Sequence, residues 1–191
     1  MRHARKMQKD RFTQKAQAHG YLARSVYKLF AINQKYRLIR KGDNVLDLGC
    51  WPGSWLQACL QFRARPVGID LRETTIKGAE AYIGDVTQDK VFMLLKDRKF
   101  DVVLSDLAPS TSGHREQDQY LSYELSKRAF FIAKNVLKHN GNFLVKIFQS
   151  KEADELLKEL KKSFNFVKSA KPEASKKRSK EIYYVCFGYN G

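Results

Sequence analysis

The chain has 191 residues, of which 43% are hydrophobic and 29% charged, a balance typical of one globular domain and not of a disordered or disulfide-framework protein. No apolar run approaches the ~20 residues needed to span a bilayer, so we expect no membrane partner. The net charge is +16, and residues 1–41 carry twelve of the basic residues but only one acidic residue. An excess of positive charge at one end predicts binding to RNA, although it can also serve only solubility.

The predicted elements alternate between helices and strands. Residues 1–18 are polar and basic and predict a mobile arm or a loosely formed helix; we assign 1–20 as an RNA-binding arm and 21–191 as a single domain. Apolar residues recur at helical spacing from Ser25 to about Tyr36, with Ser25 as the N-cap. Further helices are expected at 54–62, 87–95, 119–137 and 151–162, and strands at 44–48, 66–70, 81–84, 100–105, 142–148, 164–169 and 181–189. The helix over 119–137 is expected to stop before His139-Asn140-Gly141, because Asn-Gly suits a helix end.

This alternation predicts an α/β fold in which a mostly parallel seven-stranded sheet carries helices on both faces. The last two strands are joined by Ala170–Lys180, which contains Pro172 and no helical apolar stripe. We therefore expect a C-terminal hairpin and an antiparallel edge. In open sheets of this kind, ligands bind beyond the carboxyl ends of the strands.

The turn after the first strand reads Asp47-Leu48-Gly49-Cys50-Trp51-Pro52-Gly53-Ser54-Trp55. Gly49 and Gly53 leave room for a ligand to approach the backbone, and the helix that follows offers free N–H donors. An ordinary strand-to-helix turn would also use glycine and proline. The pattern is not G-x-G-x-x-G, which argues against a dinucleotide that carries a pyrophosphate.

Carboxylates follow the next strands at the same predicted edge. Asp70 lies 23 residues after Asp47, close to the ~20-residue separation at which an acidic residue binds ribose hydroxyls. Asp85 and Asp106 come after the third and fourth strands. Each alone is more often a loop residue or a helix cap, but together they indicate a nucleoside or sulfonium-nucleoside ligand.

Lys146 lies within the apolar segment Phe143–Phe148, where an unpaired ammonium would be costly. It is therefore either functional or satisfied by a structural carboxylate. Glu181, after the basic cluster 176–180, and Lys28, on the first predicted helix, would in isolation be read as solvated surface charges.

The cysteines and histidines predict neither a disulfide framework nor a metal site. Cys50, Cys59 and Cys186 are an odd number without a C-x-x-C pair, and the four histidines lack the spacing of metal ligands. A reducing compartment, the cytoplasm, fits this usage. An organellar origin stays open because the arm is poor in acidic residues, although it is also short of serine.

Taken together, these segments resemble the FtsJ-like ribosomal RNA large-subunit 2′-O-ribose methyltransferases from Tyr21 to Tyr189. The resemblance rests on five segments, namely 24–29 (Arg-Ser-Val-Tyr-Lys-Leu), the turn 47–55, 105–109 (Ser-Asp-Leu-Ala-Pro), 144–149 (Leu-Val-Lys-Ile-Phe-Gln) and 178–183 (Arg-Ser-Lys-Glu-Ile-Tyr). The turn alone would indicate only a Rossmann-like class I methyltransferase, whereas the ordered set is far more specific.

The resemblance implies a catalytic tetrad, composed of Lys28, Asp106, Lys146 and Glu181. It also implies S-adenosylmethionine as the cofactor, bound by Asp47, Gly49, Pro52, Gly53, Trp55, Asp70, Asp85 and Asp106. Two positions depart from the family: Trp51 stands where small residues are common, and Ser110 where asparagine is frequent. Both departures concern the wall of the cofactor site more than the reaction.

The implied activity is 2′-O-methylation of a ribose, with a uridine of large-subunit ribosomal RNA as the favoured acceptor. Lys146 is the candidate base for the weakly acidic ribose hydroxyl, and Lys28 and Glu181 would position the ribose. Transfer RNA is an alternative acceptor, and a non-catalytic RNA-binding or ribosome-assembly protein a remote one. We expect a monomer that needs no metal.

Overall fold

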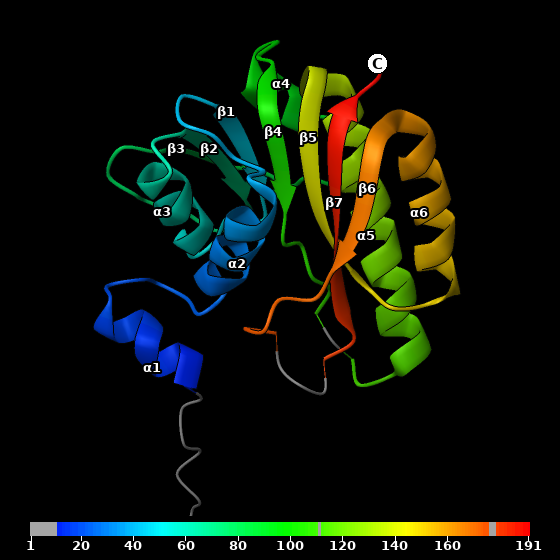
Figure 1. The fold of residues 1–191 in the computed structure, drawn as a ribbon, viewed down its shortest axis with the longest axis horizontal. Helices are drawn as coiled ribbons and strands as arrows, with labels where there is room; N and C mark the ends of the chain where they lie inside the picture. The colour runs from blue at the N-terminus through cyan, green and yellow to red at the C-terminus, as the bar shows by residue number, and fades with distance from the viewer. Residues whose placement is uncertain (1–10, 111, 176–178) are drawn as a thin grey trace, which may run out of the picture.

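The computed structural model describes residues 11–110, 112–175 and 179–191, which form one seven-stranded sheet in the order β3-β2-β1-β4-β5-β7-β6 (Figure 1). The strands are β1 (Asn44–Leu48), β2 (Arg65–Asp70), β3 (Glu80–Ile83), β4 (Phe100–Ser105), β5 (Leu137–Phe148), β6 (Phe164–Ala170) and β7 (Glu181–Tyr189). The helices are α1 (Arg11–Ala18), α2 (Val26–Tyr36), α3 (Ser54–Gln61), α4 (Val91–Leu95), α5 (Arg115–Val136) and α6 (Lys151–Ser163).

The predicted α/β class and the C-terminal hairpin are confirmed. Strands β1 to β5 pair in parallel, and β7 runs antiparallel to both β5 and β6. Because β7 inserts between β5 and β6, the edge strand is β6. It pairs antiparallel with β7, so the expected antiparallel edge is confirmed.

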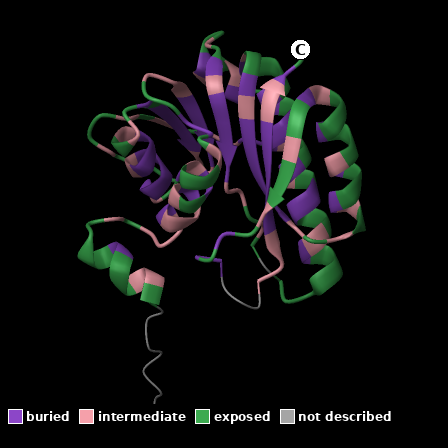
Figure 2. Ribbon diagram, viewed as in Figure 1, coloured by how far each residue is buried: buried purple, intermediate pink, exposed green. Residues whose placement is uncertain are grey.

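Helices cover both faces of the sheet and bury two separate cores. The first core, between the sheet and helices α4, α5 and α6, includes Phe130, Phe143 and Leu156. The second core, between the sheet and helices α2 and α3, includes Leu29, Leu104 and other fully buried side chains. Figure 2 shows the buried residues concentrated in the central strands. Full burial of each such apolar side chain stabilises the folded state by ~1.5–3 kcal/mol relative to leaving it exposed to water.

The junction of α5 and β5 differs from the prediction. The chain passes from Val136 directly into β5 at Leu137, so His139-Asn140-Gly141 lies within the strand and does not stop a helix. The pairing register with β4 shifts between Phe100 and Val102, and Asn140 takes a positive φ of 60° in this irregular stretch. Regular pairing resumes at Asn142, where the strand was predicted to begin.

Helix α2 begins after Ser25 as predicted, whereas α5 begins at Arg115 and not at about Gln119. Helix α4 begins at Val91 and not at Thr87, because Thr87 donates two hydrogen bonds to the Asp85 carboxylate and forms a turn there. Ser25 precedes α2 but makes no capping hydrogen bond with its side chain. Its hydroxyl instead shares a 2.9 Å hydrogen bond with that of Ser54, which joins α2 to the start of α3.

The second half of the predicted basic arm is an ordered helix, α1. Phe12 and Ala16 lie one turn apart on it; Ala16 is buried, and the ring of Phe12 lies 5.8 Å from that of Tyr27 on α2. Lys15 sits over the same Tyr27 ring at 4.8 Å. The apolar stripe that anchors α1 is only two residues long, which is why the sequence did not predict a packed helix. Residues 1–10 of the arm lie outside the described residues.

Candidate active site

The site forms where the second core reaches the carboxyl edge of the sheet. Side chains two residues apart on a strand share a face, so Lys146 continues the face on which Leu144 is buried. Asp106 follows Leu104 by two residues, just beyond the end of β4. The layer that is apolar in the sheet interior therefore becomes charged at its rim.

Strand β7 contributes to the same rim from the other side. Its pairing with β5 sets Tyr183 opposite Lys146, and Glu181 opposite Phe148. Directly opposite residues of antiparallel strands project to the same face. The hairpin thus brings Glu181 beside Lys146, although 34 residues separate them in the sequence.

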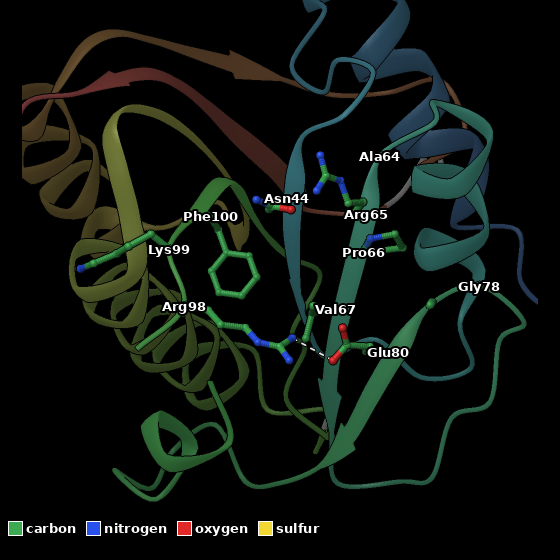
Figure 3. Close-up of a pocket in the computed structure, with 11 residues that line it drawn as sticks. Asn44, Ala64, Arg65, Pro66, Val67, Gly78, Glu80, Arg98, Lys99 and Phe100 are labelled. Atoms are coloured by element: carbon green, nitrogen blue, oxygen red, sulfur yellow. Dashed lines mark hydrogen bonds and ion pairs between the residues drawn. The ribbon is translucent and has the colours of Figure 1, made fainter. Parts of the chain in front are cut away.

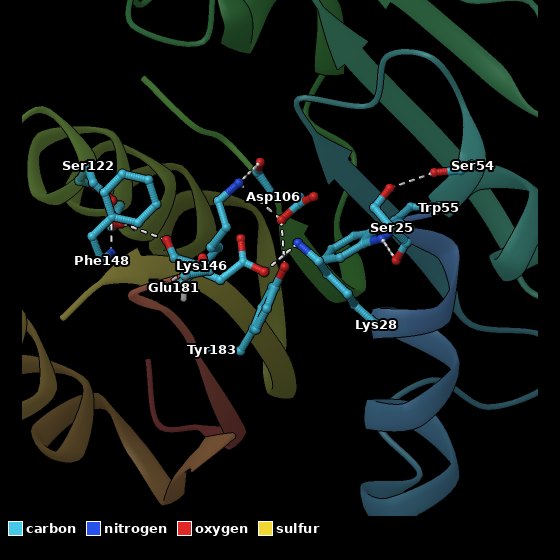
Figure 4. Close-up of polar contacts among 12 residues, drawn as sticks. Ser25, Lys28, Ser54, Trp55, Asp106, Ser122, Lys146, Phe148, Glu181 and Tyr183 are labelled. Atoms are coloured by element: carbon cyan, nitrogen blue, oxygen red, sulfur yellow. Dashed lines mark hydrogen bonds and ion pairs between the residues drawn. The ribbon is translucent and has the colours of Figure 1, made fainter. Parts of the chain in front are cut away.

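The four tetrad residues form two linked ion pairs (Figure 4). Lys146 Nζ, in a side chain only 5% exposed, donates a 2.6 Å hydrogen bond to the backbone oxygen of Asp106 and lies 3.1 Å from its Oδ1. Lys28 Nζ lies 2.5 Å from Oε1 of Glu181. Between the pairs, the hydroxyl of Tyr183 donates to Asp106 Oδ1 at 2.7 Å, and Lys28 Nζ sits 5.8 Å from the centre of the Tyr183 ring.

The electrostatics of this cluster keep Asp106 ionised. Burial opposes its charge, but the ammonium groups of Lys146 and Lys28 and the hydroxyl of Tyr183 outweigh that effect and lower the pKa of Asp106. Burial and the carboxylates of Asp106 and Glu181 raise the pKa of Tyr183 well above its ordinary value. Tyr183 is therefore a hydrogen-bond donor that holds the Asp106 carboxylate in place.

Asp106 also borders a cavity of about 390 Å³ that lies beyond β1, β2 and β4. Gly49, Asp70 and Asp85 line this cavity together with Asp106, so the structure brings these four predicted site residues together. The two oxygens of Asp70 accept backbone N–H groups, Oδ2 from Trp51 and Oδ1 from Arg72, each at 3.0 Å. These bonds fix the carboxylate at the rim and leave it further lone pairs for a ligand.

Asp85 is held in a similar way. Its Oδ1 accepts the backbone N–H and the hydroxyl of Thr87, at 2.9 and 2.6 Å, and Oδ2 accepts from Gln88 at 3.2 Å. These hydrogen bonds lower its pKa, led by the Thr87 hydroxyl. Asp85 therefore caps a turn and also lines the cavity, and its role in binding a ligand stays a prediction.

The glycine turn, which we call the glycine cradle, has a backbone conformation that favours glycine at Gly49 and Gly53. A Cβ on Gly49 would lie 2.8 Å from the side chain of Leu107, and one on Gly53 would lie 2.6 Å from that of Ile76. Both glycines also have positive φ, 82° and 112°. Gly49 also lines the cavity, so its backbone can lie close to a ligand there.

Asp47 gives an independent test of whether S-adenosylmethionine fits. Its carboxylate is 1% exposed, and neither oxygen has a hydrogen-bond partner among the described residues. Burial and the charges of Asp106 and Asp70 raise its pKa well above the ordinary value of 3.8. A buried, unsatisfied carboxylate beside a glycine cradle suits a ligand with an ammonium and a sulfonium charge.

Of the residues predicted to bind the cofactor, four do not line this cavity: Asp47, Pro52, Gly53 and Trp55. The Trp55 side chain is 2% exposed, donates its indole N–H to the backbone oxygen of Ser25 at 2.9 Å, and packs near the ring of Tyr183. It is a core residue, and its assignment to the cofactor site stays a prediction. Pro52 follows a cis peptide bond.

Trp51 forms the cavity wall instead. Its side chain is 49% exposed, and the Arg72 guanidinium stacks 4.4 Å from the centre of its ring. The bulky residue that departs from the family pattern is thus part of the lining of this cavity.

Sequence reasoning missed the residues that position the tetrad. Beyond Ser105, β4 no longer pairs with β5, so the backbone at the end of β5 needs other partners. Ser126 donates to the backbone oxygen of Lys146 at 2.8 Å, and Ser122 accepts the backbone N–H of Phe148 at 3.0 Å. These two serines lie one turn apart on α5, and that spacing within an otherwise apolar stripe was the available signal.

A second cavity lies at the opposite edge of the sheet, where β1 to β4 begin (Figure 3). Its volume is about 620 Å³, and an exposed ion pair between Arg98 and Glu80, 2.8 Å long, crosses it. Among the residues the structure describes, no group of three or more His, Cys, Asp or Glu is arranged to hold a metal, and no helix is long and apolar enough to cross a membrane.

The parallel sheet, the carboxylate rim and the glycine cradle define a Rossmann-like methyltransferase. The sequence profile of the FtsJ-like methyltransferases matches residues 21–189, and the chain belongs to that family.

Related proteins cover nearly the whole chain. It is 40% identical over 183 residues to ribosomal RNA large subunit methyltransferase E of Archaeoglobus fulgidus, covering 94% of this chain and 96% of that protein. The protein of the same name from Syntrophobacter fumaroxidans is 41% identical over 185 residues, covering 93% and 94%. The crystal structure of a Plasmodium falciparum protein assigned as a ribosomal RNA methyltransferase superposes with a TM-score of 0.80 at 29% identity, covering 90% of this chain and 100% of that one.

Proposed function

We propose that this methyltransferase transfers the methyl group of S-adenosylmethionine to the 2′-hydroxyl of a uridine ribose in large-subunit ribosomal RNA. The observation that carries the proposal is the double role of Asp106, which borders the nucleoside-sized cavity and pairs with the buried amine of Lys146. The names of the related proteins support ribosomal RNA as the acceptor.

The tetrad residues are assigned roles according to their contacts. Lys146, in its neutral form, accepts the proton of the ribose hydroxyl, and Asp106 orients its amine. Lys28 and Glu181 form the other pair and hold the ribose in line for attack. When bound, S-adenosylmethionine supplies a methyl group on a positively charged sulfur that becomes a neutral thioether.

The cofactor is assigned to the cavity lined by Gly49, Asp70, Asp85 and Asp106, with Asp47 beneath it. Asp70 would bind the ribose hydroxyls of the cofactor, as acidic residues at this strand end do. The backbone of Gly53 and the first turn of α3 supply N–H donors. We further propose a cytoplasmic monomer; its three cysteines are buried and unpaired, which suits a reducing compartment.

The proposal is tested by incubating the protein with labelled S-adenosylmethionine and three acceptors: large ribosomal subunits, deproteinised large-subunit ribosomal RNA and transfer RNA. The modified nucleotide is then mapped by mass spectrometry. We expect one 2′-O-methyluridine in large-subunit ribosomal RNA. Methylation of transfer RNA alone, or of a base and not a ribose, would refute the assignment.

A further inference from the structure

Phe148 lies beside the tetrad but has no place in either core. It follows Lys146 by two residues on β5 and faces Glu181 across the pairing with β7, so it lies on the same face as both. Its side chain is partly exposed, and among the described residues it packs with neither of the two core clusters. A phenylalanine that leaves this much ring surface outside the core is available to a ligand.

Phe148 is among the residues that line two cavities. One, of about 300 Å³, is lined by Arg24, Ser25, Lys28, Phe148, Ser179 and Glu181. The other, of about 310 Å³, is lined by Gly113, Arg115, Asp118, Gln119, Phe148, Ser179 and Lys180. Phe148 and Ser179 border both, so we call the two cavities together the acceptor groove.

The charges around the groove suit a nucleic-acid strand. Arg24 and Lys28 lie at one end and Arg115 and Lys180 at the other, with Phe148 between them. The acidic side chains present are engaged: Glu181 pairs with Lys28, and Asp118 accepts the backbone N–H and the hydroxyl of Ser112. An aromatic ring between cationic ends is the arrangement by which proteins bind single-stranded RNA.

The backbone under Phe148 is fixed before any ligand binds. Its N–H donates to Ser122 on α5 at 3.0 Å, and the next N–H, of Gln149, donates to the backbone oxygen of Lys180 at 2.9 Å. The ring therefore projects from a strand end whose backbone is hydrogen-bonded to α5 on one side and to Lys180 on the other. A platform held in this way loses little entropy on binding.

We propose that Phe148 is the platform on which a base of the acceptor RNA stacks, at or beside the nucleotide whose ribose faces Lys146. Two strand residues span ~7 Å, which is comparable to the reach from a ribose hydroxyl to its base. Every base has a flat π-face, so this contact supplies affinity and alignment without reading the sequence. The proposal rests on RNA being the substrate.

The experiment compares Phe148→Leu, Phe148→Ala and Phe148→Trp in methyl transfer to large ribosomal subunits and in binding to deproteinised large-subunit ribosomal RNA. Removing one base–aromatic stack should weaken RNA binding about 5- to 150-fold. We expect the leucine and alanine variants to show this loss in KM with kcat little changed, and the tryptophan variant to retain wild-type affinity. The salt dependence of RNA binding should stay unchanged, because no phosphate contact is removed.

Phe166→Leu is the matched control, since Phe166 is also an exposed phenylalanine on a strand, β6. It pairs with Phe187, which lies on β7 six residues beyond Glu181, and so it stands away from the acceptor groove. Calorimetric titration with S-adenosylmethionine should give wild-type affinity for all variants. Wild-type RNA affinity in Phe148→Leu, or equal losses in the leucine and tryptophan variants, would overturn the stacking role. If the wild-type protein methylates none of the RNAs, the proposed function is refuted. If it methylates RNA but Phe148→Leu binds RNA as wild type does, only the stacking role is refuted.

Discussion

Replacing Lys146 with methionine removes the ammonium while keeping a long, unbranched side chain. The change breaks the 3.1 Å pair with Asp106 and leaves that carboxylate with the hydroxyl of Tyr183. Loss of one partner from a buried ion pair costs about 3–5 kcal/mol. Because 19% of the Asp106 side chain still faces the cavity, we expect the lower end of this range.

A loss of about 3 kcal/mol in a chain of this size lowers the melting temperature by roughly 6–12 °C. Adding Asp106→Asn to Lys146→Met removes the stranded charge and should restore most of that stability. Activity should not return, because loss of a general base typically costs 10²–10⁴-fold in rate. Lys146→Arg keeps the positive charge and the stability but cannot accept the proton, since a guanidinium stays protonated.

Thermal unfolding, calorimetric titration with S-adenosylmethionine and methyl transfer to large ribosomal subunits separate these effects. We expect Lys146→Arg to be folded, to bind the cofactor and to be inactive. Near wild-type activity in that variant would refute the base assignment and leave Lys146 a positioning role. If the double variant were no more stable than Lys146→Met, the reasoning about the stranded carboxylate would be wrong.

Three other predictions concern the proposed cofactor site and the basic arm. Asp70→Ala should weaken S-adenosylmethionine binding by about 1–3 kcal/mol in calorimetry, because ligand hydroxyls lose their acceptor; unchanged binding would remove Asp70 from the site. Asp47 has a raised pKa in the folded protein, so its contribution to stability is full below about pH 3.8 and falls as the pH rises toward the folded pKa. Without cofactor, Asp47→Asn should therefore be more stable than wild type at pH 7 but not at pH 3 in denaturant titrations, and parallel pH profiles would contradict this. Deleting residues 1–18, which hold six basic residues, should flatten the salt dependence of RNA binding and leave cofactor affinity intact; an unchanged slope would place the arm away from the RNA.

The bounds of several strands were predictable, because a short apolar run between two turn signals indicates where a strand begins and ends. Strands β1, β4 and β7 begin and end where the sequence placed them. The start of β5 was not predictable in the same way, because no helix-breaking residue separates it from α5. Asn140 has a positive φ in an irregular part of the strand, and asparagine with a positive φ also occurs at helix ends.

Within the site, residue types could be chosen from the sequence but not their pairing. That Lys146 needs a partner follows from its apolar surroundings, whereas the pairing of Lys28 with Glu181 depends on the register of the β5–β7 pair. That register is fixed by tertiary contacts of β7 and not by a short turn. The burial of Trp55 likewise depends on α2, whose backbone accepts its indole N–H.

The insertion of β7 between β5 and β6 means that the four tetrad residues come together only when the last strand of the sheet has paired. A ribosome releases β7 after every other strand of this sheet, and only then are Glu181 and Tyr183 available to Lys28 and Asp106. Pairing β7 with β5 and β6 closes long-range contacts, which form slowly. A partly synthesised chain would hold the glycine cradle and Asp70, yet would present Lys28 and Asp106 without their partners.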